Sequence, residues 1–331
     1  MPPGFRSTWS LPASSRSTRS PESRRIAMAG FSVRAEQIDL PRGAYHKAPR
    51  TCVTWNDRTV LGFSQNDHRA YLFPVCTPAG LPVTTETPTD HPHHNSVWIG
   101  ADHVTALLPF AENLYEEATY SFYINETFQG RAPGRIISRS IQHAEPAANH
   151  LQLVQTIDWI GPVEWGAADG RVIAEETRTV DICPAEDGHT IDLHSQLAPT
   201  QWDLRIGPTR HAYFGVRVIE PLRPGSGGSV VDSEGRTGTS AIRGQTGHWI
   251  HLTGEALADH HAGLVICRDA ATASQPWSLH DWGTVDVNPL GQQAHLLEAG
   301  ETLACRLRLI AHDGTLTPEQ AEQRCREFLD G

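Results

Sequence analysis

Short segments of alternating apolar and polar residues run along most of this chain, and they limit its possible folds more than any other feature of the sequence. Alternation with a period of two is typical of β-strands that bury one face. The strand-like segments are residues 31–35, 51–55, 120–124, 135–141, 151–157, 172–182 and 190–197. No helical segments alternate with them, whereas a parallel sheet needs a crossover of about a dozen residues after most strands. The sequence therefore predicts an all-β protein, built as a large antiparallel β-sandwich.

One helix is expected at the end of the chain. Thr317 suits the N-cap, Pro318 suits the first helical position, and Gln320 completes a capping box. Apolar residues then recur at helical spacing at Ala321, Cys325, Phe328 and Leu329. We therefore expect a single C-terminal helix that packs against the edge of the sandwich.

The first 30 residues differ in composition from the rest of the chain. Residues 1–25 are rich in Ser, Arg and Pro, and they lack the apolar stretch of about 7 to 15 residues found in a secretory signal. We predict that residues 1–30 are a disordered or wrongly assigned extension, with Met28 as the true start, and that residues 31–331 form one β-sandwich domain. No apolar run approaches the roughly 20 residues needed to cross a bilayer, so we expect no membrane partner and a soluble, cytoplasmic protein.

The charge of the chain argues against nucleic acid as a partner. Its 38 acidic and 27 basic residues give a formal net charge of −11, and an acidic surface repels a phosphate backbone. Neither a Gly-x-Ser-x-Gly elbow nor a phosphate-binding Gly-x-x-x-x-Gly-Lys loop occurs. Their absence disfavours a serine hydrolase and a nucleotide-dependent enzyme.

The six cysteines do not form a recognisable metal or disulfide pattern. None belongs to a Cys-x-x-Cys pair, so a zinc ribbon is not indicated. Cys183, Cys267 and Cys305 lie in strand-like segments and are predicted to be small buried hydrophobic residues. A disulfide framework is not expected in a chain this long with such scattered cysteines.

The strongest candidate for a functional site is the segment Asp90-His91-Pro92-His93-His94. Pro92 favours an extended conformation at His91, and in an extended chain His91 and His93 point to one side and His94 to the other. Two imidazoles on one side could share a divalent metal ion, or one could transfer a proton while the other binds substrate. The alternative is a surface loop of solvated histidines. The buried strand predicted at residues 96–100 follows directly and makes a free loop less favoured.

Three further segments carry residues that suit chemistry. Arg210-His211 combines a fixed cation with a titratable base, although a salt-bridged end of a sheet is equally consistent. His280 and Trp282 precede Asn288, and an indole ring can pack on the apolar face of a sugar, although it could equally lie in the core. Glu176 lies in a strand and could enter a concave sheet face, although a cross-strand ion pair is the more common arrangement.

Several of these segments, in this order, are similar to a soluble bacterial family whose members often carry the label "methane oxygenase PmoA" or are described as a domain of unknown function. The matching segments are residues 90–100, 175–179, 215–218, 232–235, 288–291 and 312–314. The resemblance implies a galactose-mutarotase-like supersandwich and a link to carbohydrate metabolism. The chain departs from the family pattern at Asn95, at Arg210-His211 and at Trp282, which leaves the substrate and the reaction open.

The leading hypothesis is a carbohydrate-active enzyme of the lyase, hydrolase or isomerase type that acts on a small sugar or oxidised sugar. His93 or His94 would donate or accept a proton, and His211 would be the opposing acid or base. Arg210 would stabilise negative charge on oxygen, and Trp282 would stack on the ring. The residues assigned to substrate binding are Arg210, Trp282, His280, Glu176 and Asn288.

Two alternatives remain open at the level of sequence. A metal-dependent enzyme, such as an oxygenase, would use His91 and His93 with a remote ligand such as His211 or His280. A non-catalytic sugar-binding module would need fewer proton-active groups. Convergence of the histidines on one pocket would favour an active site. The sequence does not indicate the oligomeric state.

Overall fold

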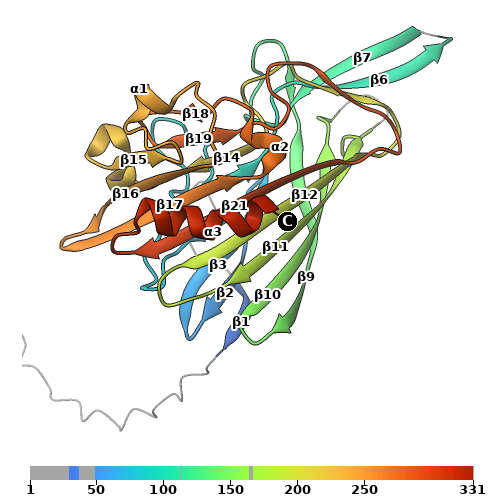
Figure 1. The fold of residues 1–331 in the computed structure, drawn as a ribbon. Helices are drawn as coiled ribbons and strands as arrows, with labels where there is room; N and C mark the ends of the chain where they lie inside the picture. The colour runs from blue at the N-terminus through green and yellow to red at the C-terminus, as the bar shows by residue number, and fades with distance from the viewer. Residues whose placement is uncertain (1–29, 37–48, 113, 164–166, 331) are drawn as a thin grey trace, which may run out of the picture.

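The computed structural model describes residues 30–36, 49–112, 114–163 and 167–330 (Figure 1). It confirms the all-β prediction, with three sheets and one long C-terminal helix. The prediction for residues 1–30 lies outside the described residues except for Gly30. No helix within the described ranges is long and apolar enough to cross a membrane.

The first large sheet has eight antiparallel strands. Its order is β1 (Phe31–Glu36), β2 (Arg50–Trp55), β3 (Arg58–Gln65), β4 (Ala70–Val75), β5 (Val97–Ile99), β14 (Phe214–Arg217), β19 (Thr284–Val287) and β18 (Ser278–Leu279). Strands from the first third of the chain therefore meet strands from its second half near the middle of this sheet, because β5 pairs with β14.

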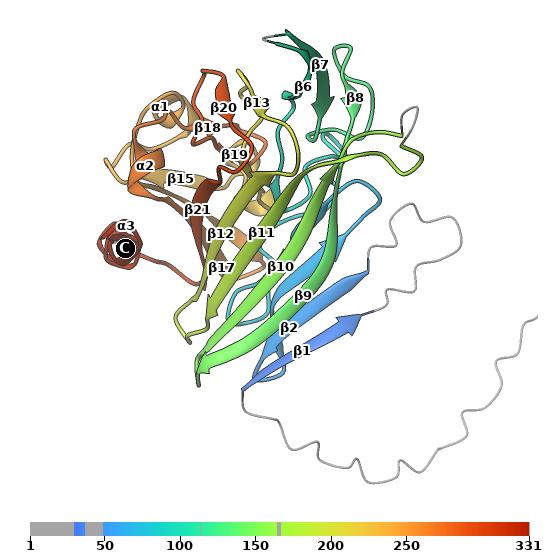
Figure 2. The same cartoon turned by 90° about the vertical axis from the view of Figure 1, so that its right-hand side faces the viewer.

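The second large sheet also has eight antiparallel strands. Its order is β15 (Ser229–Asp232), β16 (Trp249–Leu257), β17 (His260–Arg268), β21 (Leu303–Asp313), β12 (His189–Pro199), β11 (Val172–Cys183), β10 (His150–Ile160) and β9 (Arg135–Ala147). Figures 1 and 2 show the two sheets as layers of a sandwich. Apolar residues of both sheets form one continuous core between them.

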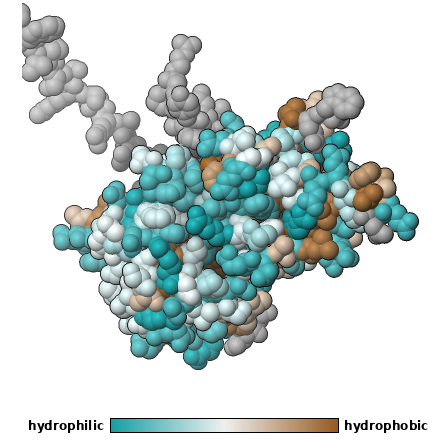
Figure 3. Space-filling model, turned by 90° about the horizontal axis from the view of Figure 1, so that it is seen from above, coloured by the Kyte–Doolittle hydropathy of each residue, from teal (hydrophilic) through white to brown (hydrophobic). Residues whose placement is uncertain are grey.

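A smaller sheet extends from one end of the sandwich. Its order is β20 (His295–Leu297), β13 (Leu204–Ile206), β6 (Val104–Ala111), β7 (Leu114–Ser121) and β8 (Ala132–Pro133). The β6–β7 hairpin projects from the body (Figure 1), and apolar residues gather on that side of the molecule in Figure 3. Phe110, near the tip, is 71% exposed. The strand predicted at residues 120–124 is only partly right, because β7 ends at Ser121.

The remaining regular elements are short helices in the connections and one longer helix. They are the 3-10 helices η1 (Glu220–Leu222) and η2 (Pro224–Ser226) and the α-helices α1 (Thr239–Ile242), α2 (Ala270–Ala273) and α3 (Pro318–Asp330). The capping box of α3 is confirmed, since the Gln320 amide N–H donates to Thr317 Oγ1 at 3.3 Å and the Thr317 amide N–H donates to Gln320 Oε1 at 2.9 Å.

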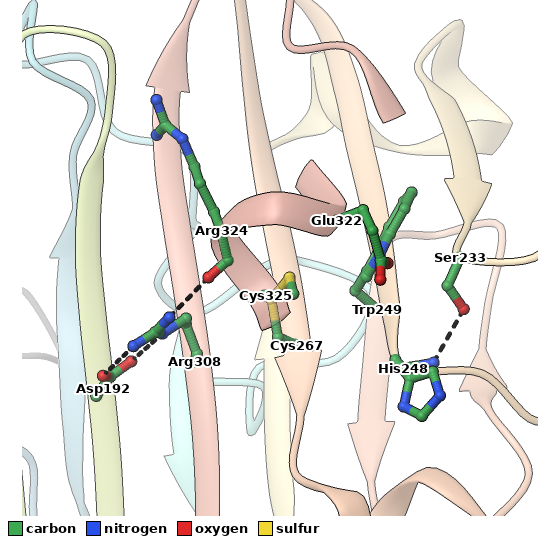
Figure 4. The surroundings of a disulfide bond; sticks show 9 residues. All are labelled: Asp192, Ser233, His248, Trp249, Cys267, Arg308, Glu322, Arg324 and Cys325. Atoms are coloured by element: carbon green, nitrogen blue, oxygen red, sulfur yellow. Dashed lines mark hydrogen bonds and ion pairs between the residues drawn. A yellow bond between two sulfur atoms is a disulfide. The ribbon is translucent and has the colours of Figure 1, made fainter. Parts of the chain in front are cut away.

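Helix α3 packs on the outer face of the second sheet and not on the sandwich edge (Figure 2). Its buried face, with Phe328, meets Trp249 and Val265 on the sheet. Figure 4 shows a disulfide between Cys267 of β17 and Cys325 of α3. The prediction of Cys267 as a small unpaired hydrophobic residue was therefore wrong.

The other cysteine predictions divide in the same way. Cys305 is buried as expected, but Cys183 is exposed because it is the last residue of β11 and the burial pattern ends there. The Cys267–Cys325 pair spans 58 residues. Nothing in that spacing marks a pair, because the partners come together only when α3 docks on the sheet.

The outer face of the first sheet provides the floor of the candidate site. Tyr71, Trp98, Gly215 and Asp286 lie opposite one another on neighbouring strands and so share one face. A Cβ atom at position 215 would lie 2.1 Å from the Trp98 ring. Glycine at this position therefore lets the indole lie flat across the sheet.

Candidate functional site

Rings from four separate segments meet over this floor. The His94 ring stacks on Trp98 with centroids 5.0 Å apart and on His91 at 4.6 Å. The His93 ring meets Tyr123 edge to face at 5.1 Å. Tyr123 in turn stacks on His211 at 4.5 Å. We call His91, His93, His94, His211 and His280, together with Tyr123 and Trp282, the histidine cluster.

Trp282 and His280 complete this cluster on its exposed side. The Trp282 ring stacks on His280 at 4.2 Å and on His91 at 5.4 Å. The indole is 37% exposed. Trp282 is therefore not a core residue, although two imidazoles lie against it. The structure brings together all five histidines that the sequence singled out.

The segment that carries His91, His93 and His94 is a turn. The His94 amide N–H donates to the His91 carbonyl at 2.9 Å, which closes a four-residue turn through Pro92. The predicted extended geometry was therefore wrong. The turn places the His91 and His94 rings in parallel contact, where an extended chain would have directed them to opposite sides.

The hydrogen bonds of His94 fix its tautomer. Arg217 Nη1 can only donate, and it lies 3.3 Å from His94 Nδ1, so Nδ1 accepts and Nε2 carries the hydrogen. Nε2 then donates to the Tyr123 hydroxyl at 2.7 Å. Burial, assisted by the nearby charge of Arg217, holds the pKa of His94 far below its usual range. His94 is thus a neutral group that orients Tyr123.

Arg217 ties the turn to the sheet. It is fully buried, and its Nη2 donates to both oxygens of Asp90 at 2.7 and 2.6 Å. Asp90 also accepts from His91 Nδ1 at 3.0 Å. Although burial raises the pKa of Asp90, the hydrogen bonds from Arg217 and His91 outweigh it and keep the carboxyl ionised. The position of the His91–His94 turn is therefore set by a charged network.

His211 forms a carboxylate–imidazole pair with Asp102. The distance from His211 Nδ1 to Asp102 Oδ2 is 2.9 Å, and Thr209 also donates to Asp102. Arg210 Nε donates to His211 Nε2 at 3.1 Å, so Nδ1 carries the hydrogen and Nε2 presents a lone pair. Burial raises the pKa of Asp102, but the hydrogen bonds from His211 and Thr209 lower it by more. The pKa is therefore below its usual value, and the carboxylate stays ionised.

His93 and His280 are held neutral by their surroundings. Burial, and then the charge of Arg69, lowers the pKa of His93 to about 4. Burial, and then the charge of Arg243, lowers the pKa of His280 to about 4. Arg243 Nη2 donates to His280 Nδ1 at 3.1 Å. Among the described residues, no hydrogen bond engages the ring nitrogens of His93, so this imidazole can accept a proton from a ligand.

Asp286 is a site residue that sequence reasoning missed. It lies on the floor beside Gly215, and among the described residues its carboxyl accepts a hydrogen bond only from Ser278 Oγ, at 3.1 Å. Burial raises the pKa of Asp286 to about 7, although the charges of His211 and Arg210 oppose the shift. A carboxyl that titrates near neutral pH can both donate and accept a proton. The available signal was one acid in the otherwise apolar strand Thr284–Val287, where every residue is buried.

Two predicted binding residues lie away from the cluster. Glu176 is buried between the sheets, where it accepts hydrogen bonds from Trp159, Arg178 and Ser195 at 2.9 to 3.0 Å. Glu176 lies on β11 of the second sheet and forms an internal ion pair with Arg178, so the first sheet separates it from the histidines. Asn288 Nδ2 donates to the Thr209 carbonyl at 2.9 Å, so Asn288 holds the loop that carries Arg210 and His211.

The metal hypothesis gains no support from the geometry. Within the described part of the chain, no three His, Cys, Asp or Glu side chains are grouped so that they could hold a metal ion. The rings of His91 and His93 lie edge to face with centroids 5.8 Å apart. The nitrogens of His91, His94 and His211 instead face carboxylates, guanidinium groups or hydroxyls.

A separate cavity lies between α3 and the second sheet, away from the cluster. It measures about 390 Å³ and its lining includes Asp192, Arg308 and Arg324. Arg308 donates to both oxygens of Asp192 at 2.6 and 2.7 Å, and Arg324 pairs with Asp187 (Figure 4 shows the first pair). These charges already satisfy one another, so we assign no site there.

Comparison with known families and structures now places the chain. The model of DUF6807, described as a family of unknown function, matches residues 50–326. No curated protein matches the sequence. The match to DUF6807 does not test the resemblance to the proteins labelled PmoA, which stays a prediction.

Three solved structures are similar at low identity. An α-galactosidase of family GH36 from Geobacillus stearothermophilus is 11% identical, with a TM-score of 0.39, and the alignment covers 84% of this chain and 41% of that protein. The chain therefore spans less than half the length of that enzyme. A galactose mutarotase-like protein from Clostridium acetobutylicum is 11% identical, with a TM-score of 0.33, covering 86% and 99% of the two chains. The Slr1438 protein from Synechocystis is 10% identical, with a TM-score of 0.31, covering 87% and 98%.

Proposed function

The chain belongs to the DUF6807 family, and from the geometry of its site we propose that it is an enzyme that acts on a sugar-like small molecule by proton transfer, of the lyase, hydrolase or isomerase type. The observation that carries this proposal is the Asp102–His211 pair, placed among the rings of His93, Tyr123 and the other members of the cluster. Four separate segments of the chain supply these groups, and a purely structural contact needs no such set.

His211 is the proposed base. Asp102 fixes its tautomer and would stabilise the imidazolium that forms when Nε2 takes a proton. Among the described residues, Arg210 alone donates to this Nε2, and its exposed side chain can turn toward a ligand. A ligand that draws Arg210 away therefore uncovers the base.

Asp286 and Tyr123 are the proposed proton donors. Asp286 is protonated over part of the neutral range, because burial raises its pKa to about 7. Burial also raises the pKa of Tyr123, so the phenol keeps its hydrogen, and its oxygen already accepts from His94. The Tyr123 hydroxyl can then donate to an oxygen of the ligand where negative charge develops. His93 is the second candidate base.

The sugar class is supported by the exposed side of the cluster. The 37% exposed Trp282 supplies an apolar edge beside His91 and His280. Aromatic rings pack on the apolar faces of sugar rings, while imidazole and guanidinium groups suit their hydroxyls. This combination at the rim of a set of titratable groups fits a sugar better than an apolar ligand.

The test is turnover of a panel of monosaccharides, disaccharides, keto-sugars and sugar acids, followed by NMR. We expect His211→Ala and Asp102→Asn each to lower turnover by about 10²- to 10⁴-fold, which is the usual contribution of a general acid or base. His261→Ala is the matched control, because His261 is exposed and lies on β17 of the other sheet. Equal turnover by His211→Ala and wild type would contradict the proposal.

A further inference from the structure

Positive charge is concentrated around the histidine cluster, although the chain as a whole carries a formal net charge of −11. Five guanidinium groups contact its rings, backbone or carboxylates, and they belong to Arg69, Arg131, Arg210, Arg217 and Arg243. Arg131 and Arg217 are paired with carboxylates. In the described part of the chain, no carboxylate lies within 4 Å of the guanidinium groups of Arg69, Arg210 or Arg243. The site thus has an excess of cations.

Arg69 is the most unusual of these groups. It follows directly on the turn between β3 and β4, and it is fully buried. Its Nη2 donates to the Tyr123 carbonyl and lies 3.1 Å from His68 Nε2, and its guanidinium carbon lies 5.9 Å from the centre of the Trp98 ring. Burial lowers its pKa only to about 10, so Arg69 remains charged at neutral pH. The charge therefore lies directly beneath the cluster.

The hydrogen-bonding capacity of this turn is left incomplete. Arg69 Nε and Arg69 Nη1 are both buried without a hydrogen-bond partner among the described residues. Buried charges in proteins are usually paired, because removing an isolated ion from water is unfavourable. A bound anion above the floor would supply the missing negative charge, since attraction between charges is strong in a water-poor environment.

We propose that the ligand of this site is an anionic sugar that carries a carboxylate, with Arg210 contacting the carboxylate at the rim and Arg69 attracting it from beneath. This inference rests on the proposed function, since it takes the ligand to be a sugar. The exposed Arg210 suits a direct contact, because a guanidinium group binds a carboxylate through two parallel hydrogen bonds. Arg69 has no exposed surface, so it acts through its charge and positions the ligand without touching it.

The proposal can be tested by binding, without knowledge of the reaction. The probes are pairs that differ by the carboxylate alone, glucuronate with glucose and galacturonate with galactose, and glucose 6-phosphate serves as a second anion. Affinities of the full chain are measured by titration calorimetry. We expect at least one acid to bind at least 10-fold more tightly than its neutral partner at low salt, and the difference to shrink as the salt concentration rises.

Variants separate a role in recognition from a role in folding. Arg210→Gln should lower the affinity for the acid by about 5- to 20-fold and the affinity for the neutral sugar by clearly less, while Arg210→Lys should keep most of the preference. Arg69→Met should lower the affinity for the acid without lowering the melting temperature, because an unpaired buried charge does not stabilise the fold. If Arg69→Met fails to fold, Arg210→Gln still tests whether the site recognises the carboxylate, because Arg210 is exposed and its replacement should not affect folding.

The outcomes distinguish this inference from the proposed function. Equal binding of acids and neutral sugars overturns the inference, and so does a preference for the phosphate over every carboxylate. His211-dependent turnover of a neutral sugar would then leave the proposed function standing. Tight, Arg210-dependent binding of an acid supports the inference even if no variant at His211 changes any turnover, a result that would count against the enzyme.

Discussion

The two outer faces of the sandwich both contain buried histidines, but they differ in what surrounds them. On the second sheet, His251 and His312 meet with their Nε2 atoms 2.8 Å apart, and Gly263 leaves room for them, because a Cβ there would lie 2.4 Å from His312. On the first sheet, His93 and His94 lie among rings and charges from four segments. The same residue type thus serves two different environments.

The pKa values alone do not separate the two faces. Burial lowers the pKa of His251 to about 3 and that of His93 to about 4. The His251–His312 pair is self-contained, since one imidazole donates to the other. His93 has no hydrogen bond to its ring nitrogens within the described ranges, and Nε2 of His211 is covered by the exposed Arg210. A functional site is therefore indicated by open nitrogens and unpaired charge, and not by burial.

The largest effect on stability is expected from the face that α3 covers. Phe328→Ala removes a ring that is 1% exposed and lies over Arg306 and Arg308, so we expect the free energy of unfolding to fall by about 3 to 5 kcal/mol. Urea denaturation measures this, with Phe110→Ala as the exposed control that should change it by less than about 0.5 kcal/mol. We expect folded Phe328→Ala to keep its sugar turnover. A loss of turnover would show that packing under α3 affects the histidine cluster, and that the two outer faces are not independent.

A smaller effect, a gain in stability that depends on pH, is expected from Asp286→Asn on the outer face of the first sheet. Burial raises the pKa of Asp286 from 3.8 to about 7. The folded state holds this proton more tightly than the unfolded state, so the stabilisation is complete below pH 4 and is lost as the pH rises through 7. Asp286→Asn should therefore gain stability relative to wild type by roughly 2 to 4 kcal/mol between pH 4 and pH 8. Denaturation with urea at a series of pH values measures the difference.

His251→Gln, on the outer face of the second sheet, is the matching variant for urea denaturation at the same series of pH values. The pKa of His251 is lowered in the folded state, so its stabilisation is present above about pH 6.5 and is lost as the pH falls toward 3. The variant should lose less unfolding free energy than wild type as the pH falls below 6.5. Between pH 7 and 8, the pH dependence of its stability should match that of wild type. Parallel curves for Asp286→Asn and wild type would show that Asp286 is not held protonated.

The smallest effect is expected at the first turn of α3. Thr317→Ala removes the hydroxyl that accepts from the Gln320 amide, and we expect a loss of about 1 kcal/mol of unfolding free energy. Thr315→Ala is the matched control, because Thr315 is exposed just before the helix. If the two variants lose equal stability, the capping box contributes nothing beyond the general effect of the substitution.

The fold class was predictable from local pattern, but only part of the strand order was. Strand alternation identified β1, β2 and β9 to β12 of the two large sheets, and the Thr317–Gln320 capping box identified α3. Local pattern could not identify the Cys267–Cys325 pair or place α3 on the face of the sheet, because both depend on docking between distant segments.

The site was predictable in part for the same reason. The histidines and Trp282 were visible as unusual local composition, and the structure brings them together. Tyr123, Asp286 and Arg69 were missed because no local motif marks them, and only the fold brings them together at the site. Glu176 was a candidate because it lies in a predicted strand, but its partner Arg178 explains it.

The Cys267–Cys325 bond has a topological consequence for the site. The closed ring of chain between the two cysteines contains His280, Trp282, Asp286 and Asn288, while the His91–His94 turn and His211 lie outside it. Two of the seven members of the cluster, His280 and Trp282, therefore belong to a covalent loop, and the other five belong to the open chain. A single proteolytic cut anywhere from residue 268 to residue 324 would release no fragment until the disulfide is reduced.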